Sequence, residues 1–308
     1  MTRFTASTLD LSSLDPASLW PALTFQGFTD ERIHSAEGLL ARLSAAGIPF
    51  NVENLESDIT IKGQETSAYR ELLAHQAMRD IALDLTVAFG RGRLLDLKGI
   101  EYGTTRLVVT PAMNGADAVM ESDDRFRARI QLAPEAFGGA GTPGGYIYHA
   151  TATSPDVHDV GVVMLGRGTP NVTVELTIMS ASGNGEPSDS LLEDVRRRML
   201  SENIKMLTDV VTVRRAVAIP YTIAAVLHVP SGPDPEVIRQ AAITSVNAMA
   251  SRYQRLAGGV PHSAVVAALH VGGVDHVTDV TPTNDVLTER YQFGRLTGVN
   301  VSIQVLRG

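Results

Sequence analysis

The 308-residue chain contains no cysteine, which excludes disulfide bonds, thiolate catalysis and cysteine-ligated zinc or iron–sulfur centres. Aromatic residues are also scarce, at 5% with a single tryptophan, so the interior must consist mainly of Leu, Val, Ile and Ala. No apolar run approaches the roughly 18 residues that a membrane-spanning helix needs. The first 16 residues lack the apolar core of a secretory signal. We therefore expect a soluble protein.

Positive charge is in short supply as well. The formal net charge is −8, and the short basic runs at 125–129 and 196–198 lie among acidic residues. A nucleic-acid-binding protein needs a clustered basic face, so we expect no nucleic acid partner and interpret these runs as solvated helix faces or a salt-bridge rim. Hydrophobic residues make up 44% of the chain, enough for a real core, and the length suits two domains or one large domain with lobes.

The reactive residues form no recognisable catalytic or metal-binding pattern. The eight histidines include no H-E-x-x-H pair, and the chain has no G-x-S-x-G elbow or Walker loop. His262, His270 and His276, with Asp275, come nearest to a metal or acid–base site, but ordinary surface histidines explain them better. A sugar-active enzyme would need paired carboxylates in a cleft lined with aromatic residues, which are scarce here. We expect no catalytic residue, no metal and no cofactor.

The N-terminal half shows mainly helical patterns. Residues 1–35 contain scattered apolar residues without a helical period, which predicts an arm that packs on neighbouring subunits or, alternatively, a short helix lying on the body. Residues 36–145 form a mainly helical region with a glycine-rich join. Within it we predict a loop over 104–120 and four helices: 35–46, 65–89, 94–102 and a charged helix over 123–132 that ends before Pro134.

The predicted helix over 65–89 has more apolar surface than a lone surface helix needs. Its apolar positions fall partly on one face and extend nearly all round in the last turns, which is typical of a helix buried by its own fold or by a partner. We therefore predict that this helix and the next one carry an assembly interface. The residues assigned to it are Tyr69, Leu72, Leu73, Ile81, Leu94 and Leu95.

The C-terminal half alternates between strand and helix patterns. The predicted strands cover 151–153, 160–165, 172–179, a strand pair over 209–217 and 221–229, then 274–280 and 299–306. The predicted helices cover 189–201, 235–256 and 262–270. We divide this half into two α+β units, 146–205 and 206–308, the second assigned to dimerisation. The predicted fold class is α+β, with a mainly helical N-terminal half followed by two small α/β-sandwich-like units whose sheets are mostly antiparallel.

A glycine-rich stretch joins the two halves. Gly139, Gly141 and Gly144 fit the G-x-G-x-x-G spacing of a dinucleotide-binding loop, which works only when a strand enters it and a helix leaves it. Here a helical run enters, and the β-branched and aromatic run at 146–151 leaves. We therefore expect a turn between a helix and a strand. A nucleotide-binding enzyme that uses these three glycines is the alternative.

Several segments of the chain together carry a resemblance to known proteins. They are RFRARIQLAPEAF and GGYIYHATATSPDVHDVGV around the glycine-rich join, the helical stretch at 55–103, and NIKMLTDVVTVRRAVAIPYTIAAVLHVPSGPD at 203–234. In order and spacing these segments resemble the baseplate J-like family of contractile phage tails and related injection machines. The resemblance spans about residues 50 to 275 and implies a structural wedge subunit located in the virion tail baseplate, after assembly in the host cytoplasm. It implies copies that pair through their C-terminal regions and join a second wedge protein. Six such wedges would surround hub or spike proteins and rearrange on contraction.

Overall fold

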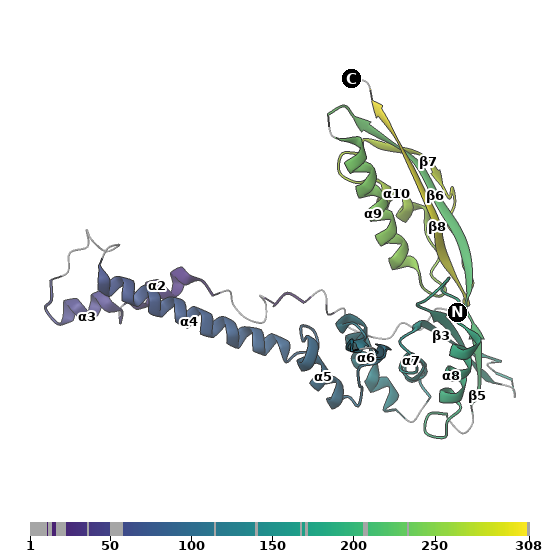
Figure 1. Cartoon of the computed structure of the whole chain (residues 1–308), viewed down its shortest axis with the longest axis horizontal. Coiled ribbons are helices and arrows are strands. Elements are labelled where there is room, and N and C mark those ends of the chain that lie inside the picture. The colour runs from purple at the N-terminus through teal and green to yellow at the C-terminus, as the bar shows by residue number, and fades with distance from the viewer. Residues whose placement is uncertain are drawn as a thin grey trace. The chain divides into compact units, whose positions relative to one another are not determined.

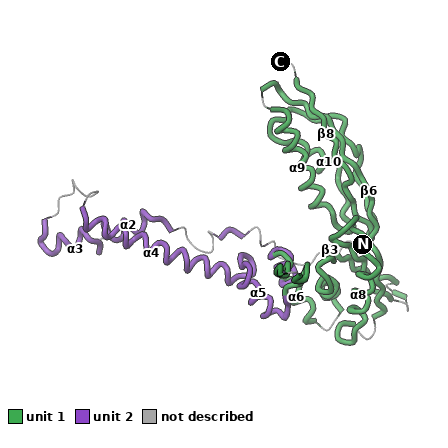
Figure 2. Tube along the Cα trace, viewed as in Figure 1, with its two compact units in different colours: residues 1–7, 106–122, 131–308 green, residues 8–105, 123–130 purple. Residues whose placement is uncertain are grey.

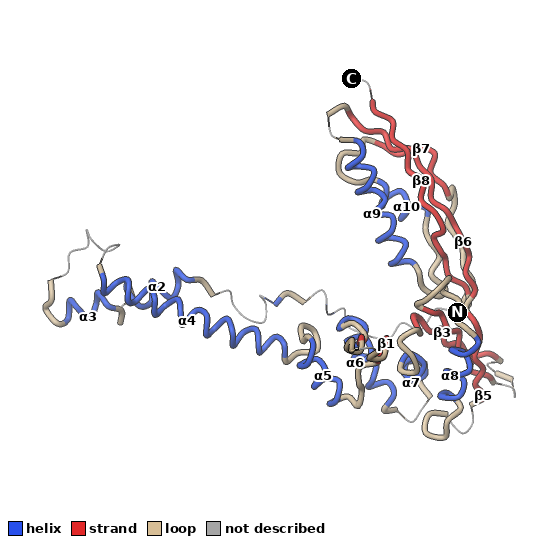
Figure 3. Tube along the Cα trace, viewed as in Figure 1, coloured by secondary structure: helices blue, strands red, loops and turns tan. Residues whose placement is uncertain are grey.

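The computed structural model places helices mainly in the N-terminal half and small sheets in the C-terminal half, which confirms the predicted α+β class (Figures 1 and 3). No helix among the described residues is long and apolar enough to cross a membrane. Two compact units emerge (Figure 2): unit 1 comprises 1–7, 106–122 and 131–308, and unit 2 comprises 8–105 and 123–130. The residues that the structure describes are 11, 14–16, 23–35, 37–49, 58–113, 115–138, 141–166, 168–169, 172–205, 209–232 and 234–306.

Unit 2 is helical, as predicted. Its helices are α2 (Phe25–Ile33), α3 (Leu39–Ala45), α4 (Ile59–Asp84), α5 (Gly92–Glu101) and the first eight residues of α6 (Asp123–Ala136). The long helix α4 begins earlier than the predicted residue 65, because the Asp58 carboxylate accepts hydrogen bonds from the backbone N–H groups of Thr60 and Ile61 and caps the first turn. Hydrogen bonds from Thr60, side chain and backbone, lower the pKa of Asp58.

The first turns of α6 hydrogen-bond to the connection between α4 and α5. The Arg127 guanidinium donates hydrogen bonds of 2.8 Å to the carbonyls of Val87 and Gly90. Leu95, Phe126 and Ile130 form a fully buried cluster between α5 and α6. Arg129 is only 5% exposed, so the interpretation of the basic run at 125–129 as a solvated face is wrong at this position.

Two predictions around the glycine-rich join are wrong. Helix α6 continues through Pro134 to Ala136 instead of ending before the proline. The run at 146–151, predicted as a strand exit, lies in helix α7 (Pro143–Thr151). Thr142 caps this helix through the Gly145 N–H, and Pro143 suits its first turn. These local signals start a helix here, although β-branched and aromatic side chains favour a strand.

Unit 1 contains a two-stranded and two three-stranded sheets. The predicted loop at 104–120 contains the short hairpin β1 (Val108–Thr110) and β2 (Val119–Met120). The second sheet has the order β3-β4-β5, and its strands are β3 (Val157–Leu165), β4 (Thr173–Ser180) and β5 (Val210–Arg215). Helices α7 and α8 (Asp189–Met199) contribute Tyr146, Ala150, Leu191 and Val195 to its core. The Ser188 hydroxyl caps α8 by accepting a hydrogen bond from the Leu191 N–H.

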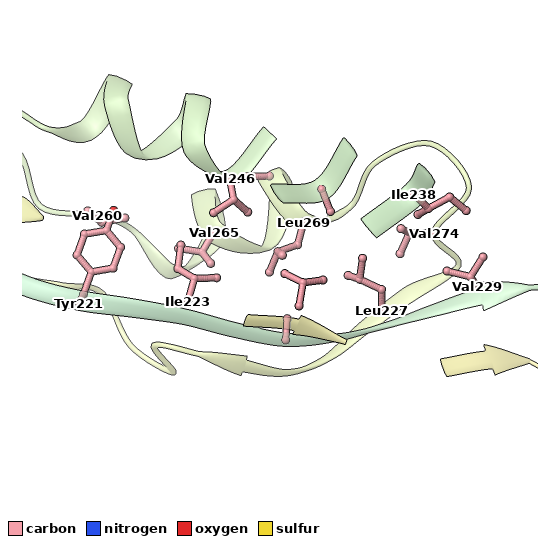
Figure 4. Close-up of a cluster of buried hydrophobic side chains, with 14 residues drawn as sticks. Tyr221, Ile223, Leu227, Val229, Ile238, Val246, Val260, Val265, Leu269 and Val274 are labelled. Atoms are coloured by element: carbon pink, nitrogen blue, oxygen red, sulfur yellow. The ribbon is translucent and has the colours of Figure 1, made fainter. Parts of the chain in front are cut away.

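The third sheet has the order β7-β6-β8, with β6 (Val217–Pro230), β7 (His276–Thr281) and β8 (Gln292–Leu306). Helices α9 (Pro235–Tyr253) and α10 (His262–Leu269) cover one face of it (Figure 4). Alternate residues of β6 point into the core beneath these helices. They are Tyr221, Ile223, Ala225, Leu227 and Val229.

Antiparallel pairing predominates in the described part of the chain, in three of the five strand pairs. Each three-stranded sheet also contains one parallel pair, β4 with β5 and β6 with β8. Parallel neighbours require a crossover connection, and here the helices α8, α9 and α10 lie in those connections. The helix positions predicted from sequence therefore fit this mixed topology, although the parallel pairs themselves were not predicted.

The predicted strand pair over 209–217 and 221–229 is wrong, because β5 and β6 belong to different sheets. Only Ala216 separates them; it is fully buried, and its N–H donates a 2.9 Å hydrogen bond to the Ile178 carbonyl. Met179, Leu256 and Phe293 pack around Ala216 and join the two sheets. The division into 1–35, 36–145, 146–205 and 206–308 stays a prediction.

We predict that Phe293→Ala lowers the free energy of unfolding by about 3–5 kcal/mol, because it leaves a cavity at the join between the two sheets. Chemical denaturation followed by circular dichroism measures this change. Amide hydrogen exchange should rise in both β4 and β6, since the side chain packs between their sheets. The matched control is Val305→Ala at a side chain that is 47% exposed. A loss of protection confined to β6 and β8 would contradict the shared join.

Candidate functional site

The long helix α4 presents two different faces. On one face Ile61, Ala68 and Leu72 are buried, at spacings of seven and four residues that keep them on one side of the helix. Helix α2 packs on α4. The Phe25 ring meets Tyr69 edge-on at 6.4 Å between centroids, and an ion pair joins Arg32 to Glu71.

Part of the predicted arm is therefore a helix lying on the body of the protein. Phe25–Ile33 forms α2, in keeping with the alternative interpretation of residues 1–35. Thr24 starts it by accepting a hydrogen bond from the Gly27 N–H. Most of residues 1–22 lie outside the described residues, so whether the arm also reaches a neighbour stays a prediction.

The other face of α4 exposes apolar side chains. Ala74, Met78, Ile81 and Leu85 follow spacings of four, three and four residues, the a/d spacing of a coiled-coil seam. All four are exposed, Ile81 at 57%. We call these four residues the α4 outer seam. Exposed apolar side chains in a row on an otherwise polar helix favour a partner surface.

The six predicted interface residues separate into two groups. Tyr69, Leu73 and Ile81 lie exposed on α4, whereas Leu72 is buried on the α2 side of that helix. On α5, Leu95 is fully buried against Phe126 and Ile130, and Leu94 is half-buried. Sequence reasoning did not assign Ala74, Met78 and Leu85 to the interface, although their a/d spacing with Ile81 is a readable signal.

The glycine-rich join serves the packing of two helices. A Cβ on Gly144 would lie 2.7 Å from Cγ of Glu135, so glycine is needed where the start of α7 meets the end of α6. The Thr142 hydroxyl also donates a 3.1 Å hydrogen bond to the Glu135 carbonyl. Gly141 takes the left-handed φ of 62°, and Gly139 lies outside the described residues.

This geometry bears on the alternative interpretation of the glycine-rich stretch as a nucleotide-binding loop. A helix does leave the loop, contrary to our prediction, but the entering element is the helix α6 and not the strand that a dinucleotide loop requires. Further along α7, burial and then the positive charge of Arg198 lower the pKa of His149, which favours the neutral imidazole at pH 7.

The histidines singled out in the sequence do not converge on one site. The His276 ring stacks on His228 at 4.1 Å between centroids, and its Nδ1 lies 2.7 Å from the carboxylate Oδ2 of Asp275. His262 instead lies with its Nδ1 2.7 Å from the Pro282 carbonyl. Within the described ranges no group of three or more His, Asp and Glu side chains is arranged to hold a metal ion. His228, from β6, is the neighbour that sequence spacing missed.

Comparison with known proteins connects these features to one family. A family model described as the baseplate J-like N-terminal domain matches residues 56–113, which include all of α4 and α5. Baseplate protein J of Escherichia phage P2 is 34% identical over 289 residues, which cover 92% of this chain and 94% of that protein. The match confirms the resemblance found in the sequence.

We predict that Gly144→Ala lowers the free energy of unfolding by about 1–3 kcal/mol, because the added methyl group collides with Glu135. Gly138→Ala is the matched control, since its Cβ would have its nearest neighbour at 3.8 Å. Denaturant unfolding measures both variants. Equal stability of the two variants would contradict a packing role for Gly144.

The nucleotide alternative has a separate test on the unaltered protein. We expect NAD, ATP and FAD to leave the melting temperature unchanged, since no strand enters the glycine-rich loop. A bound nucleotide at a hundred times its Kd would stabilise the fold by about 2.7 kcal/mol, which a thermal-shift measurement detects. Such a rise with any of the three ligands would favour the enzyme.

Proposed function

The chain belongs to the baseplate J-like family, and from that premise we propose that it is a structural subunit of the baseplate of a contractile phage tail or a related injection device, not an enzyme. The observation that carries this proposal is the 34% identity to a phage baseplate protein over nearly the full length of both chains. The protein would then reside in the tail of the virion, after assembly in the host cytoplasm, and bind other baseplate proteins.

In more detail, we propose a wedge subunit. Copies pair through residues 206–308, join a second wedge protein, and six such wedges form a ring around hub or spike proteins. The ring rearranges when the tail contracts. The family resemblance supports this arrangement, and so does the modest size of each sheet, since subunits of this kind gain stability from their neighbours.

The α4 outer seam is the surface that we assign to the second wedge protein. Its a/d spacing suits the apolar stripe of one partner helix, which would lie on the side of α4 away from the buried Ile61, Ala68 and Leu72. Exposed Leu97 and Ile100 on α5 could add to this contact. Tyr69 and Leu73 are also exposed but lie on another side of α4, Tyr69 toward Phe25 of α2, so they would meet a partner surface separate from the seam. Obligate interfaces of this class bury upward of about 2,000 Å², so the seam would be one part of a larger contact.

We predict that Ile81→Asp and Met78→Asp abolish co-purification with the other baseplate proteins while the isolated chain stays folded. Both side chains are exposed, so a carboxylate there is solvated until a partner helix tries to bury it. Co-expression followed by native mass measurement reports assembly, and circular dichroism reports folding.

Two further variants separate assembly from folding. Leu72→Asp should destabilise the chain itself, by about 3 kcal/mol or more, because Leu72 is 7% exposed and the charge would be buried and unpaired. Gln76→Asp, at an exposed polar position of α4, should change neither property. Normal assembly by a folded Ile81→Asp variant would rule out the α4 outer seam as the interface without affecting the proposed baseplate role.

A further inference from the structure

Strand β8 is the longest strand among the described residues and lies at an edge of its sheet. Its 15 residues pair with β6 along their whole length, from Gln292 opposite Val217 to Leu306 opposite Pro230. The sheet order is β7-β6-β8, so in the described structure no strand pairs with the other side of β8. Alternate backbone N–H and C=O groups on that side are available to another strand.

The opposite edge strand of the same sheet is protected against such pairing. Strand β7 has only six residues, contains the charged Asp279 at a left-handed φ of 52°, and shifts register against β6 between Ala224 and Val226. It is followed directly by Pro282. A short strand, a charge, a bulge and a proline are the devices by which proteins block edge pairing.

Strand β8 lacks these devices over its last nine residues, 298–306, which we call the β8 free edge. Its one register shift against β6 lies earlier, beside Thr222. From there to Leu306 it contains no charged residue and no proline. The two edge strands of this sheet therefore differ: β7 carries features that block pairing with a further strand, and the β8 free edge carries none. This difference indicates that the β8 free edge pairs with another strand.

We propose that the β8 free edge pairs antiparallel with the same edge of a second copy, which joins two three-stranded sheets into one of six strands. The chain carries a formal net charge of −8, and an uncharged edge is where two such copies meet at the least electrostatic cost. A charged partner would find no opposite charge along it. A twofold pair uses up both free edges and leaves only the protected β7 strands outside, so the assembly closes.

The alternation of side chains fits this symmetric pairing. Val299, Val301 and Ile303 face the core under α9, whereas Asn300 and Ser302 are exposed on the other face. A twofold axis at Val301 would place Val299 opposite Ile303 of the partner subunit. It would also place Asn300 opposite Ser302 of the partner subunit. Apolar residues then meet apolar ones, and polar residues meet polar ones, across the join.

This inference deepens the proposed function, since it assigns the pairing of copies within residues 206–308 to one strand edge. The test uses the full chain, a 32.9 kDa monomer, by sedimentation equilibrium. The unaltered protein should show twice that mass. Asn300→Lys with Ser302→Lys should reduce it to the monomer, because like charges then face each other across the twofold axis. Asn300→Lys with Ser302→Glu should restore the doubled mass, because each lysine then faces a glutamate.

A control pair adds the same charge on the outer face of α9, at the exposed Ala241 and Thr244, and A241K/T244K should keep the doubled mass. Hydrogen exchange on the unaltered protein supplies a second measurement that needs no variant. Amides of residues 298–306 should lose protection on dilution to the monomer, while those of β7 should not change.

The outcomes separate this inference from the proposed function. A monomeric unaltered protein, or a doubled mass that survives N300K/S302K with no change in exchange at 298–306, would overturn the β8 pairing. Co-purification with other baseplate proteins in those same preparations would leave the baseplate role standing. Loss of both would count against the family-derived function as well.

Discussion

The architecture of unit 1 depends on a single buried alanine. Strand β5 ends at Arg215 and β6 begins at Val217, so the backbone passes from one sheet into the next with only Ala216 between them. Ala216 is fully buried, and Met179, Leu256 and Phe293 close around it. The Asp159 carboxylate accepts a 2.9 Å hydrogen bond from the Leu256 N–H, and the Glu186 carboxylate accepts one of 3.1 Å from the Ala218 N–H. That bond from Ala218, followed by one from Asn184, lowers the pKa of Glu186. The two sheets are therefore held by covalent, apolar and polar links at one place.

Local signals in the sequence were sufficient for much of the fold. Ser188 and Asp234 cap α8 and α9 as their positions suggest, and the glycine at 103, with a φ of 64°, follows the end of α5. The prediction failed where contacts distant in sequence decide the outcome. Helix α7 forms despite its β-branched and aromatic residues, because Tyr146 and Ala150 fill the core beneath the β3-β4-β5 sheet. The placement of β5 and β6 in different sheets was likewise not predicted, since two adjacent strand patterns in the sequence suggest a pair.

Prediction of the candidate interface from sequence has the same limit, because contacts distant in sequence decide which side chains are exposed. Leu72 and Leu73 are adjacent and identical in the sequence, yet one is buried on the α2 side of the helix and the other is exposed. Only the position of α2 separates them, and nothing in the periodicity of α4 states where α2 lies. The a/d spacing of Ala74, Met78, Ile81 and Leu85, by contrast, was present in the sequence and needed only the knowledge that this face is uncovered in the described structure. Surfaces for assembly are thus harder to predict than cores, because a monomer sequence encodes both with the same side chains.

The close approach of Gly144 to Glu135 has a consequence for how such chains are classified. A glycine held by the packing of two helices tolerates substitution no better than a glycine that admits a phosphate. Among relatives that keep the α6–α7 contact, we expect this position to stay glycine and the G-x-G-x-x-G spacing to recur without any nucleotide. Invariance at this motif would then record the distance between two backbones, and a search by pattern alone would assign a cofactor to a family of building blocks.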